Sequence, residues 1–258
     1  MTDTILLVER AGEYGLLLRL NRPEKRNALA TDLLTRVAEE LETAAADPSV
    51  RTVVITGADK FFAAGADINE LHARDTGGAL ADPRPAIWAR IRGFAKPLIA
   101  AVEGWSLGAG NELVMCCDLV IAGQGAKFGQ PETNLGIIPG AGGTAILPRL
   151  VGRSRAMKMV LLGDPLSATE AQAAGLVAEV VEDGQALDTA LALAARIAAR
   201  APLAMQQGKA MVRAAFETHQ SAHLILERQA FSALFGTADK REGTTAFFEK
   251  RDPQWTGS

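Results

Sequence analysis

The chain has 258 residues, 48% of them hydrophobic and 22% charged, which is enough apolar material for one large core or two smaller ones. The formal net charge of −3 provides no basic field for nucleic acid or anionic lipid. The adjacent cysteines Cys116 and Cys117 argue against a disulfide framework, and we see neither a secretion signal nor an apolar run of membrane-spanning length, so we expect a cytoplasmic protein.

The first two thirds of the chain alternate short apolar runs with helical patterns. Residues 4–9 and 15–20 predict two strands joined by a turn at Gly12, and a helix over 31–46 is predicted to begin with Thr31 as its cap. A further helix is expected from Gly108 onward. Other strands are predicted over residues 52–56, 98–102, 119–122 and 176–181. Strands that alternate with helices predict an α/β fold with a largely parallel sheet.

Two other stretches differ from this pattern. Residues 71–91 are the least regular, with two glycines and two prolines close together, and we expect a functional loop that selects the substrate. From residue 183 onward the chain is predicted to be almost wholly helical, as a satellite layer or a surface for oligomer contacts. The helices are expected over residues 185–199, 202–217, 220–235 and 238–249.

Two glycine-rich segments, residues 61–67 and 108–112, carry the strongest functional signal, and a third segment, 129–132, accompanies them. Glycine and alanine leave backbone N–H groups open to close approach by another molecule's oxygen. Two such groups from separate segments could polarise one carbonyl as an oxyanion hole. Glu112 and Glu132 would add two carboxylates for proton transfer beside it. The combination is suited to forming and protonating an enolate.

Three other patterns point elsewhere and are weaker. Residues 104–108 match the G-x-S-x-G elbow of serine hydrolases, with Ser106 as nucleophile, but no His-Gly-Gly segment precedes them and the downstream histidines fall in a helical pattern. His219 and His223 share a helix face without a metal-binding sequence around them, so no metal site is expected. The glycines of residues 140–144 resemble a phosphate loop but lack the Lys-Ser/Thr that follows one, and a turn before a helix explains them better.

The ordered set of segments resembles the crotonase (enoyl-CoA hydratase/isomerase) superfamily over essentially the whole chain. The matching segments are residues 20–23, 26–29, 62–67, 96–102, 107–110, 129–132 and 135–143. The resemblance implies a spiral of ββα units over residues 1–195 and a C-terminal helical trimerisation region over residues 196–258. It also implies a homotrimer or a dimer of trimers (a hexamer), an acyl-CoA substrate and no cofactor beyond the coenzyme A of the substrate.

The resemblance also implies residue roles. The backbone N–H groups of Ala66 and Ala109 would form the oxyanion hole, with Glu112 and Glu132 flanking the Cα–Cβ bond of the acyl group. The contacts to coenzyme A would come from Ala64, Asp67, Arg26 and, often from a neighbouring subunit, Lys250. Retention of both acids favours hydration over the alternative, Δ3-Δ2 isomerisation, in which the first acid is generally lost.

Some positions depart from the usual family pattern. Ala109 stands where glycine is common, Asn111 where cysteine is frequent, Glu103 where asparagine is usual and Asn69 where lysine is often found. Residues 83–90 are similar to those of bacterial 2,3-dehydroadipyl-CoA hydratases of phenylacetate degradation, whose substrate ends in a carboxylate. We therefore expect the acyl pocket to involve Trp88, with Arg84 or Arg90 facing that carboxylate.

Overall fold

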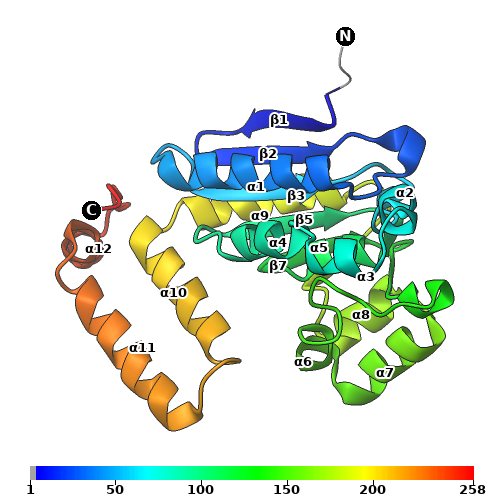
Figure 1. Ribbon diagram of the computed structural model, residues 1–258. Coiled ribbons are helices and arrows are strands. Elements are labelled where there is room, and N and C mark those ends of the chain that lie inside the picture. Colours follow the sequence, from blue (N-terminus) through cyan, green and yellow to red (C-terminus); the bar gives the residue numbers. More distant parts are fainter. Residues whose placement is uncertain (1–3) are drawn as a thin grey trace.

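The computed structural model describes residues 4–258 and contains two sheets (Figure 1). The larger sheet has six strands in the order β1-β2-β3-β5-β7-β10, and the smaller has four in the order β4-β6-β8-β9. The strands of the larger sheet are β1 (Leu6–Ala11), β2 (Gly15–Leu20), β3 (Thr52–Thr56), β5 (Leu98–Val102), β7 (Leu119–Gly123) and β10 (Glu179–Val181). Those of the smaller sheet are β4 (Phe61–Ala63), β6 (Trp105–Leu107), β8 (Lys127–Gly129) and β9 (Leu166–Ser167).

The chain passes back and forth between the two sheets. Strands β3, β5 and β7 of the larger sheet lead into β4, β6 and β8 of the smaller one, and helical segments follow each pair. Within the larger sheet only β1 pairs antiparallel, with β2, and within the smaller sheet only β9 does, with β8. This spiral of ββα units confirms the predicted α/β class with a largely parallel sheet.

The helices lie around the sheets and continue beyond them at the C-terminus. In the first half they are α1 (Thr31–Ala46), α2 (Ile68–His72), α3 (Thr76–Leu80), α4 (Arg84–Arg92) and α5 (Ala109–Val114). In the second half they are α6 (Leu147–Val151), α7 (Arg153–Leu162), α8 (Ala168–Ala174), α9 (Ala186–Ala198), α10 (Pro202–Ala214), α11 (Gln220–Leu234) and α12 (Ala238–Glu249). The short 3₁₀ helices are η1 (Pro23–Lys25) and η2 (Glu132–Leu135).

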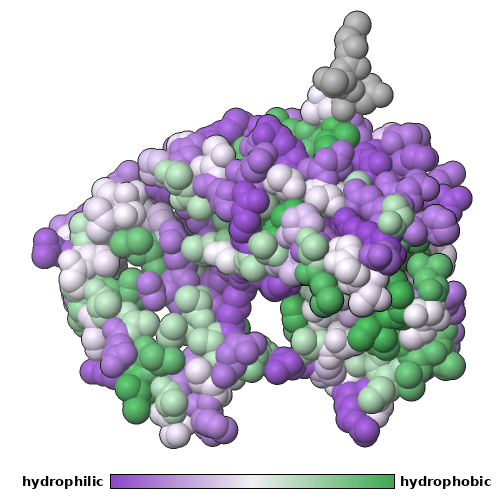
Figure 2. Space-filling view, viewed as in Figure 1, coloured by the Kyte–Doolittle hydropathy of each residue, from purple (hydrophilic) through white to green (hydrophobic). Residues whose placement is uncertain are grey.

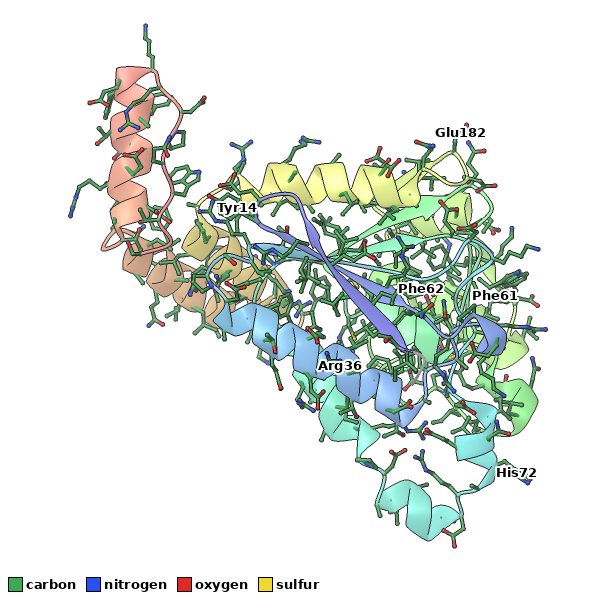
Figure 3. All side chains as sticks on the ribbon, turned by 90° about the horizontal axis from the view of Figure 1, so that it is seen from above. Tyr14, Arg36, Phe61, Phe62, His72 and Glu182 are labelled. Atoms are coloured by element: carbon green, nitrogen blue, oxygen red, sulfur yellow. The ribbon has the colours of Figure 1, made fainter. Side chains whose placement is uncertain are left out.

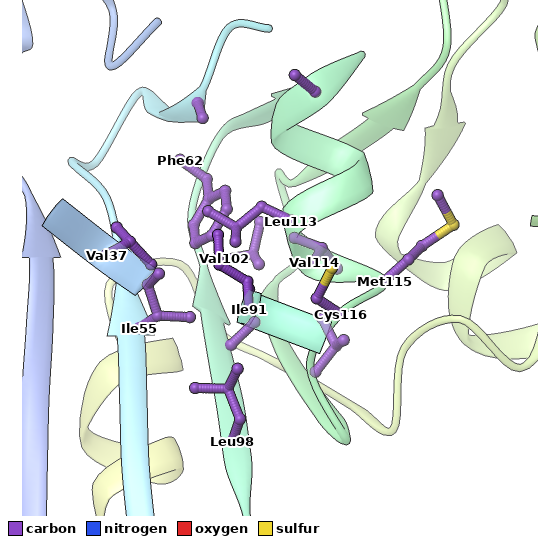
Figure 4. Packing of buried hydrophobic residues seen from close by; sticks show 14 of the residues in the cluster. Val37, Ile55, Phe62, Ile91, Leu98, Val102, Leu113, Val114, Met115 and Cys116 are labelled. Atoms are coloured by element: carbon purple, nitrogen blue, oxygen red, sulfur yellow. The ribbon is translucent and has the colours of Figure 1, made fainter. Parts of the chain in front are cut away.

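Both faces of the larger sheet are buried. On one face the main core collects side chains from α1, α4 and α5, and Figure 4 shows Val37, Phe62, Ile91 and Leu113 converging there. On the other face a smaller cluster packs α9 against the sheet through alanines, which let the helix approach closely. Burial on both faces explains why the inner strands are continuous apolar runs in the sequence rather than alternating ones.

Three predicted details were wrong. Thr31 is not the cap of α1, because the helix is preceded by Ala30 and the N–H and hydroxyl of Thr31 donate to the Glu70 carboxylate at 2.9 and 2.6 Å. The segment 71–91 is not an irregular loop, since it contains α3 and most of α4. The strand expected over 176–181 begins only at Glu179.

The C-terminal helices extend away from the sheets, and the space-filling view shows a gap between them and the body of the molecule (Figures 1 and 2). Asp118 anchors α10: its two carboxylate oxygens pair with Lys209 at 2.7 Å and Arg213 at 2.8 Å. The predicted boundary at residue 195 falls inside α9, which packs on the sheet. None of the helices formed by residues 4–258 has the length and apolar content needed to cross a membrane.

Candidate active site

The three glycine-rich segments meet because each follows a strand of the smaller sheet. Residues 64–67 follow β4, residues 108–112 follow β6, and residues 130–132 follow β8. These strands are parallel neighbours, so their carboxyl ends lie at the same edge. A hydrogen bond from the Gly108 N–H to the Gly129 carbonyl, 2.9 Å long, joins the second and third segments there.

The N–H of Ala66 is turned toward the cavity by its neighbours. The Leu29 N–H donates to the Gly65 carbonyl at 2.8 Å, and the Asp67 N–H donates to the Leu29 carbonyl at 3.3 Å. In such a bridge the intervening residue points its own N–H away from the partner segment. Within residues 4–258 the N–H of Ala66 has no acceptor, and Ala66 lines the cavity. This is the arrangement an oxyanion-hole donor needs.

The second amide comes from the start of α5. Ala109 is the first residue of that helix, so its N–H has no acceptor inside the helix. Gly108 before it has φ of +50°, and a Cβ at this position would lie 2.9 Å from Oε1 of Glu132. Only glycine therefore allows the turn into α5 and the close approach of the carboxylate together.

Glu112 is almost fully buried in α5 and is held from one side. Its Oε1 accepts hydrogen bonds from the N–H groups of Ala141 and Gly143, at 2.7 and 2.8 Å. Burial raises the pKa of Glu112, and the two hydrogen bonds oppose this rise in part. Because both donors favour the charged form and use the same oxygen, the second oxygen remains for a reactant.

Glu132 begins η2 and has different surroundings. Burial, with a smaller contribution from the charge of Glu112, raises the pKa of Glu132 to about 7. The side-chain amide of Gln130, which is fully buried, lies 3.0 and 3.1 Å from the two carboxylate oxygens. That amide can present its nitrogen to a carboxylate or its oxygen to a carboxylic acid. Glu132 is therefore the member of the pair suited to carry a proton at neutral pH.

These groups open onto one cavity of about 300 Å³. Its wall includes five of the expected site residues named so far: Ala64, Ala66, Ala109, Glu112 and Glu132. Two of the acyl-pocket candidates, Arg84 and Trp88, also line it, both from α4. The remaining wall is mostly apolar, from Ile68, Leu71, Ala79, Pro85, Leu135, Ile137 and Ile138. A cavity of this kind suits an acyl chain with its reactive end between the two acids.

Four expected site residues lie elsewhere. Arg90 points away from the cavity and pairs with Glu42 through two hydrogen bonds of 2.6 Å, which removes it as the partner of an acyl tail. The Asp67 carboxylate caps α2 and binds Arg22 at 3.1 Å, so its role here is structural. Arg26 is exposed and lies over the Phe61 ring, 5.3 Å from its centre. Lys250 is an exposed residue at the end of α12, which Figure 3 shows at the opposite end of the molecule from α2 and α3.

The three weaker sequence patterns, for a serine nucleophile, a metal site and a phosphate loop, do not correspond to functional sites among residues 4–258. Ser106 is completely buried within β6, between Ala63 and Phe128 on the neighbouring strands, so it cannot act as an exposed nucleophile. No group of His, Cys, Asp and Glu side chains within residues 4–258 is arranged to hold a metal ion. Residues 140–144 form the turn before α6 that was expected.

Three supporting features were not predicted from the sequence. The buried Asn27 side chain donates to the carbonyls of Phe61 and Phe62, both at 3.2 Å, and so fixes the loop 22–29 against β4. Gln130 contacts Glu132, as described above. The turn 140–143 holds Glu112, and Arg92 in turn donates to its Ala141 carbonyl at 2.9 Å. A signal for the third feature was present, because a glycine-rich turn exposes N–H groups that can bind an anion.

Comparison with known proteins agrees with this geometry. The family model for enoyl-CoA hydratase/isomerase matches residues 15–258. A 2,3-dehydroadipyl-CoA hydratase from Escherichia coli (strain K12) is 51% identical, with 98% of each chain covered. A crotonyl-CoA hydratase from Syntrophomonas wolfei is 42% identical, with 95% of each covered. The crystal structure of an enoyl-CoA hydratase from Bacillus anthracis superposes with a TM-score of 0.94 at 34% identity, covering 99% of this chain and all of that one. The chain therefore belongs to the enoyl-CoA hydratase/isomerase family.

Proposed function

We propose that the protein is an enoyl-CoA hydratase, which adds water across the 2,3-double bond of a 2-enoyl-CoA thioester. The observation that carries this proposal is that Glu112 and Glu132 line the same cavity as the amides of Ala66 and Ala109. The 51% identical relative, named for its action on 2,3-dehydroadipyl-CoA, supports that thioester as a substrate.

The reaction divides between these groups as follows. Glu112 accepts a proton from water as the water oxygen bonds to C3 of the acyl chain. The electrons of the double bond move onto the thioester oxygen, where the N–H groups of Ala66 and Ala109 stabilise the negative charge; one such donor is typically worth about 3 kcal/mol. Glu132 then gives its proton to C2. Proton transfer by a positioned acid or base contributes roughly 10²–10⁴ in rate, so both acids are needed.

The requirement for both acids gives the first test. We expect Glu112→Gln and Glu132→Gln each to lower kcat for hydration of crotonyl-CoA by about 10²–10⁴, because the amide neither accepts nor donates the required proton. The fall in ultraviolet absorbance as the double bond is hydrated measures turnover. CoA affinity is measured separately by calorimetry and should be retained in both variants.

Glu42→Gln provides the matched control, because Glu42 pairs with Arg90 outside the cavity. It should leave turnover unchanged. Near-normal turnover in either cavity variant would remove that residue from the mechanism.

The alternative activity, isomerisation of 3-enoyl-CoA to 2-enoyl-CoA, needs only one acid to move the proton. Faster turnover of a 3-enoyl-CoA than of crotonyl-CoA by the unaltered protein would favour it.

Coenzyme A binding, self-association and cellular compartment are further parts of this proposal. We infer that coenzyme A binds along Ala64, with Arg26 near the same loop and Lys250 reaching the site of a neighbouring copy. The exposed phenylalanines of α11 and α12 support self-association, for which we propose a homotrimer or a dimer of trimers. The thiols of Cys116 and Cys117, which are both free, support a reducing compartment such as the cytoplasm. No cofactor beyond the substrate's coenzyme A is required by the steps above.

A further inference from the structure

The wall of the cavity contains a cationic side chain, which lies beside the carboxylate of Asp82. Within residues 4–258, Arg84 is the only lysine or arginine that lines the cavity, and its side chain is largely buried. The same cavity extends to Glu112 and Glu132. A group bound at Arg84 would therefore belong to the far end of a chain whose reactive bond lies between the two acids.

Arg84 is held by one edge of its guanidinium. Its Nε and Nη2 lie 2.8 and 2.6 Å from Oδ2 of Asp82, and its backbone N–H donates to Oδ1 at 2.9 Å. The third nitrogen, Nη1, has no partner among residues 4–258. A guanidinium can bind two carboxylates at once, one along its Nε–Nη2 edge and one along its Nη1–Nη2 edge. Asp82 thus orients the arginine and leaves the second edge open.

A second arginine offsets the charge of Asp82. Nη1 of Arg74, two residues beyond the end of α2, lies 2.9 Å from the same Oδ2 atom that Arg84 contacts, and its Nη2 lies 3.5 Å from the Glu70 carboxylate. The cluster thus has two guanidinium groups and two carboxylates, and the attraction of Arg84 for an anion comes from the unpaired N–H donors of its open edge. Burial near apolar side chains such as Trp88 strengthens that attraction, because little water competes for the donors.

We propose that the open Nη1–Nη2 edge of Arg84 binds a carboxylate at the far end of the acyl chain, and so selects dicarboxylic enoyl-CoA thioesters over neutral ones. This inference rests on the proposed hydration activity and adds the group that recognises the tail. Asp82, which also lines the cavity, and Arg74, which does not, act as positioning residues, since they hold Arg84 in place.

The test compares two thioesters of equal carbon number, 2,3-dehydroadipyl-CoA, which ends in a carboxylate, and 2-hexenoyl-CoA, which ends in a methyl group. We take the ratio of kcat/KM for the thioester that ends in a carboxylate to kcat/KM for the one that ends in a methyl group. We expect Arg84→Met to lower this ratio by about 10–100-fold, the usual effect of losing a charge-assisted pair. Arg84→Lys should retain part of the preference, because it keeps the charge but loses the planar edge. Arg90→Met is the matched control from the same helix, and it should leave the ratio unchanged.

The outcomes separate the two proposals. If the unaltered protein hydrates neither thioester, the proposed function itself fails. If it hydrates both and Arg84→Met leaves their ratio within about twofold, the tail-binding role of Arg84 is wrong while hydration stands. An equal loss for both thioesters would also overturn it, because that result means Arg84 only supports the structure of α4.

Discussion

At the scale of single residues, the two acids of the cavity differ in how their oxygens are used. Glu112 receives two backbone hydrogen bonds on one oxygen, whereas Glu132 has an adaptable amide, Gln130, against both of its oxygens. The first arrangement favours a carboxylate and the second tolerates either form. This asymmetry supports the proposed roles of Glu112 as the base and Glu132 as the acid.

The proton on Glu132 leads to a prediction of pH dependence. Since the pKa of Glu132 is raised to about 7, the acid holds its proton below that pH and loses it above. We therefore expect kcat/KM for hydration of crotonyl-CoA to fall about tenfold per pH unit above neutrality. Hydration takes up no net proton, so the equilibrium constant is independent of pH and kcat/KM for the reverse dehydration must follow the same profile.

Initial rates in both directions between pH 5 and pH 9 check this prediction. A profile that stays flat to pH 9, or that rises steadily through this range, would show that the pair does not need a proton on Glu132. Because the equilibrium constant does not change with pH, the two kcat/KM profiles must coincide, and their agreement is the internal check on the measured rates.

The acids of the cavity were easier to predict from the sequence than the residues that hold them in place. Glycine-rich segments that end in an acid pointed to Glu112 and Glu132, and the family resemblance added the amides of Ala66 and Ala109. Gln130, Asn27 and Arg92 could not be predicted in this way, because each acts through a residue that only the fold brings close. Arg84 and Arg90 illustrate the limit: they are six residues apart on α4, yet only one of them faces the cavity.

At the scale of elements, the longer helices and strands were predictable and the smaller sheet was not. The apolar runs that form β3, β5 and β7 are five residues long and buried, and the periodicity of α1 and α9 to α12 is regular. Strands β4, β6 and β8 have three residues each, too few for any period to be recognised. The smaller sheet, which brings the three glycine-rich segments together, was thus the part of the fold hardest to predict from the sequence.

The attachment of α10 gives a prediction at this scale. Asp118 pairs with Lys209, whose side chain is buried, and with Arg213, and it also accepts the Leu98 N–H at 2.8 Å. We expect Asp118→Ala to lower the free energy of unfolding by about 3 kcal/mol, because it leaves a buried cation without its partner. Urea unfolding followed by circular dichroism measures this change.

Asp164→Ala is the control for that measurement. Asp164 pairs with Lys158 at 3.8 Å, and both side chains are largely exposed, so the change should cost under about 1 kcal/mol. If Asp118→Ala is as mild as this control, the helix is held to the body by contacts other than the ion pairs.

At the scale of the whole molecule, large apolar side chains remain exposed on the C-terminal helices. Phe247 and Phe248 are 79% and 81% exposed on α12, and Phe216, Phe231 and Phe235 are about half exposed nearby along the chain. A soluble monomer rarely leaves so many aromatic rings in water. These helices also extend from the body, which makes their surfaces accessible to other copies (Figure 1).

We therefore predict that the protein associates with itself through this region. Sedimentation velocity should give a mass that is a multiple of the 27.2 kDa chain, by three or six. The double variant Phe247→Glu, Phe248→Glu should shift the mass toward a single chain, because charges oppose burial of that surface. Leu80→Glu, on the exposed face of α3, should not change the mass. A single-chain mass for the unaltered protein would contradict the prediction.

The bridge between Leu29 and Ala66 links the cavity to the folding of the N-terminal segment. Both acids and the Ala109 amide come after residue 100, yet the direction of the Ala66 amide is set by Leu29, near the beginning of the chain. A partly folded chain in which that early segment has not yet docked would possess the acids but could not hold an enolate. The cavity is therefore complete only in molecules in which Leu29 has paired with Ala66.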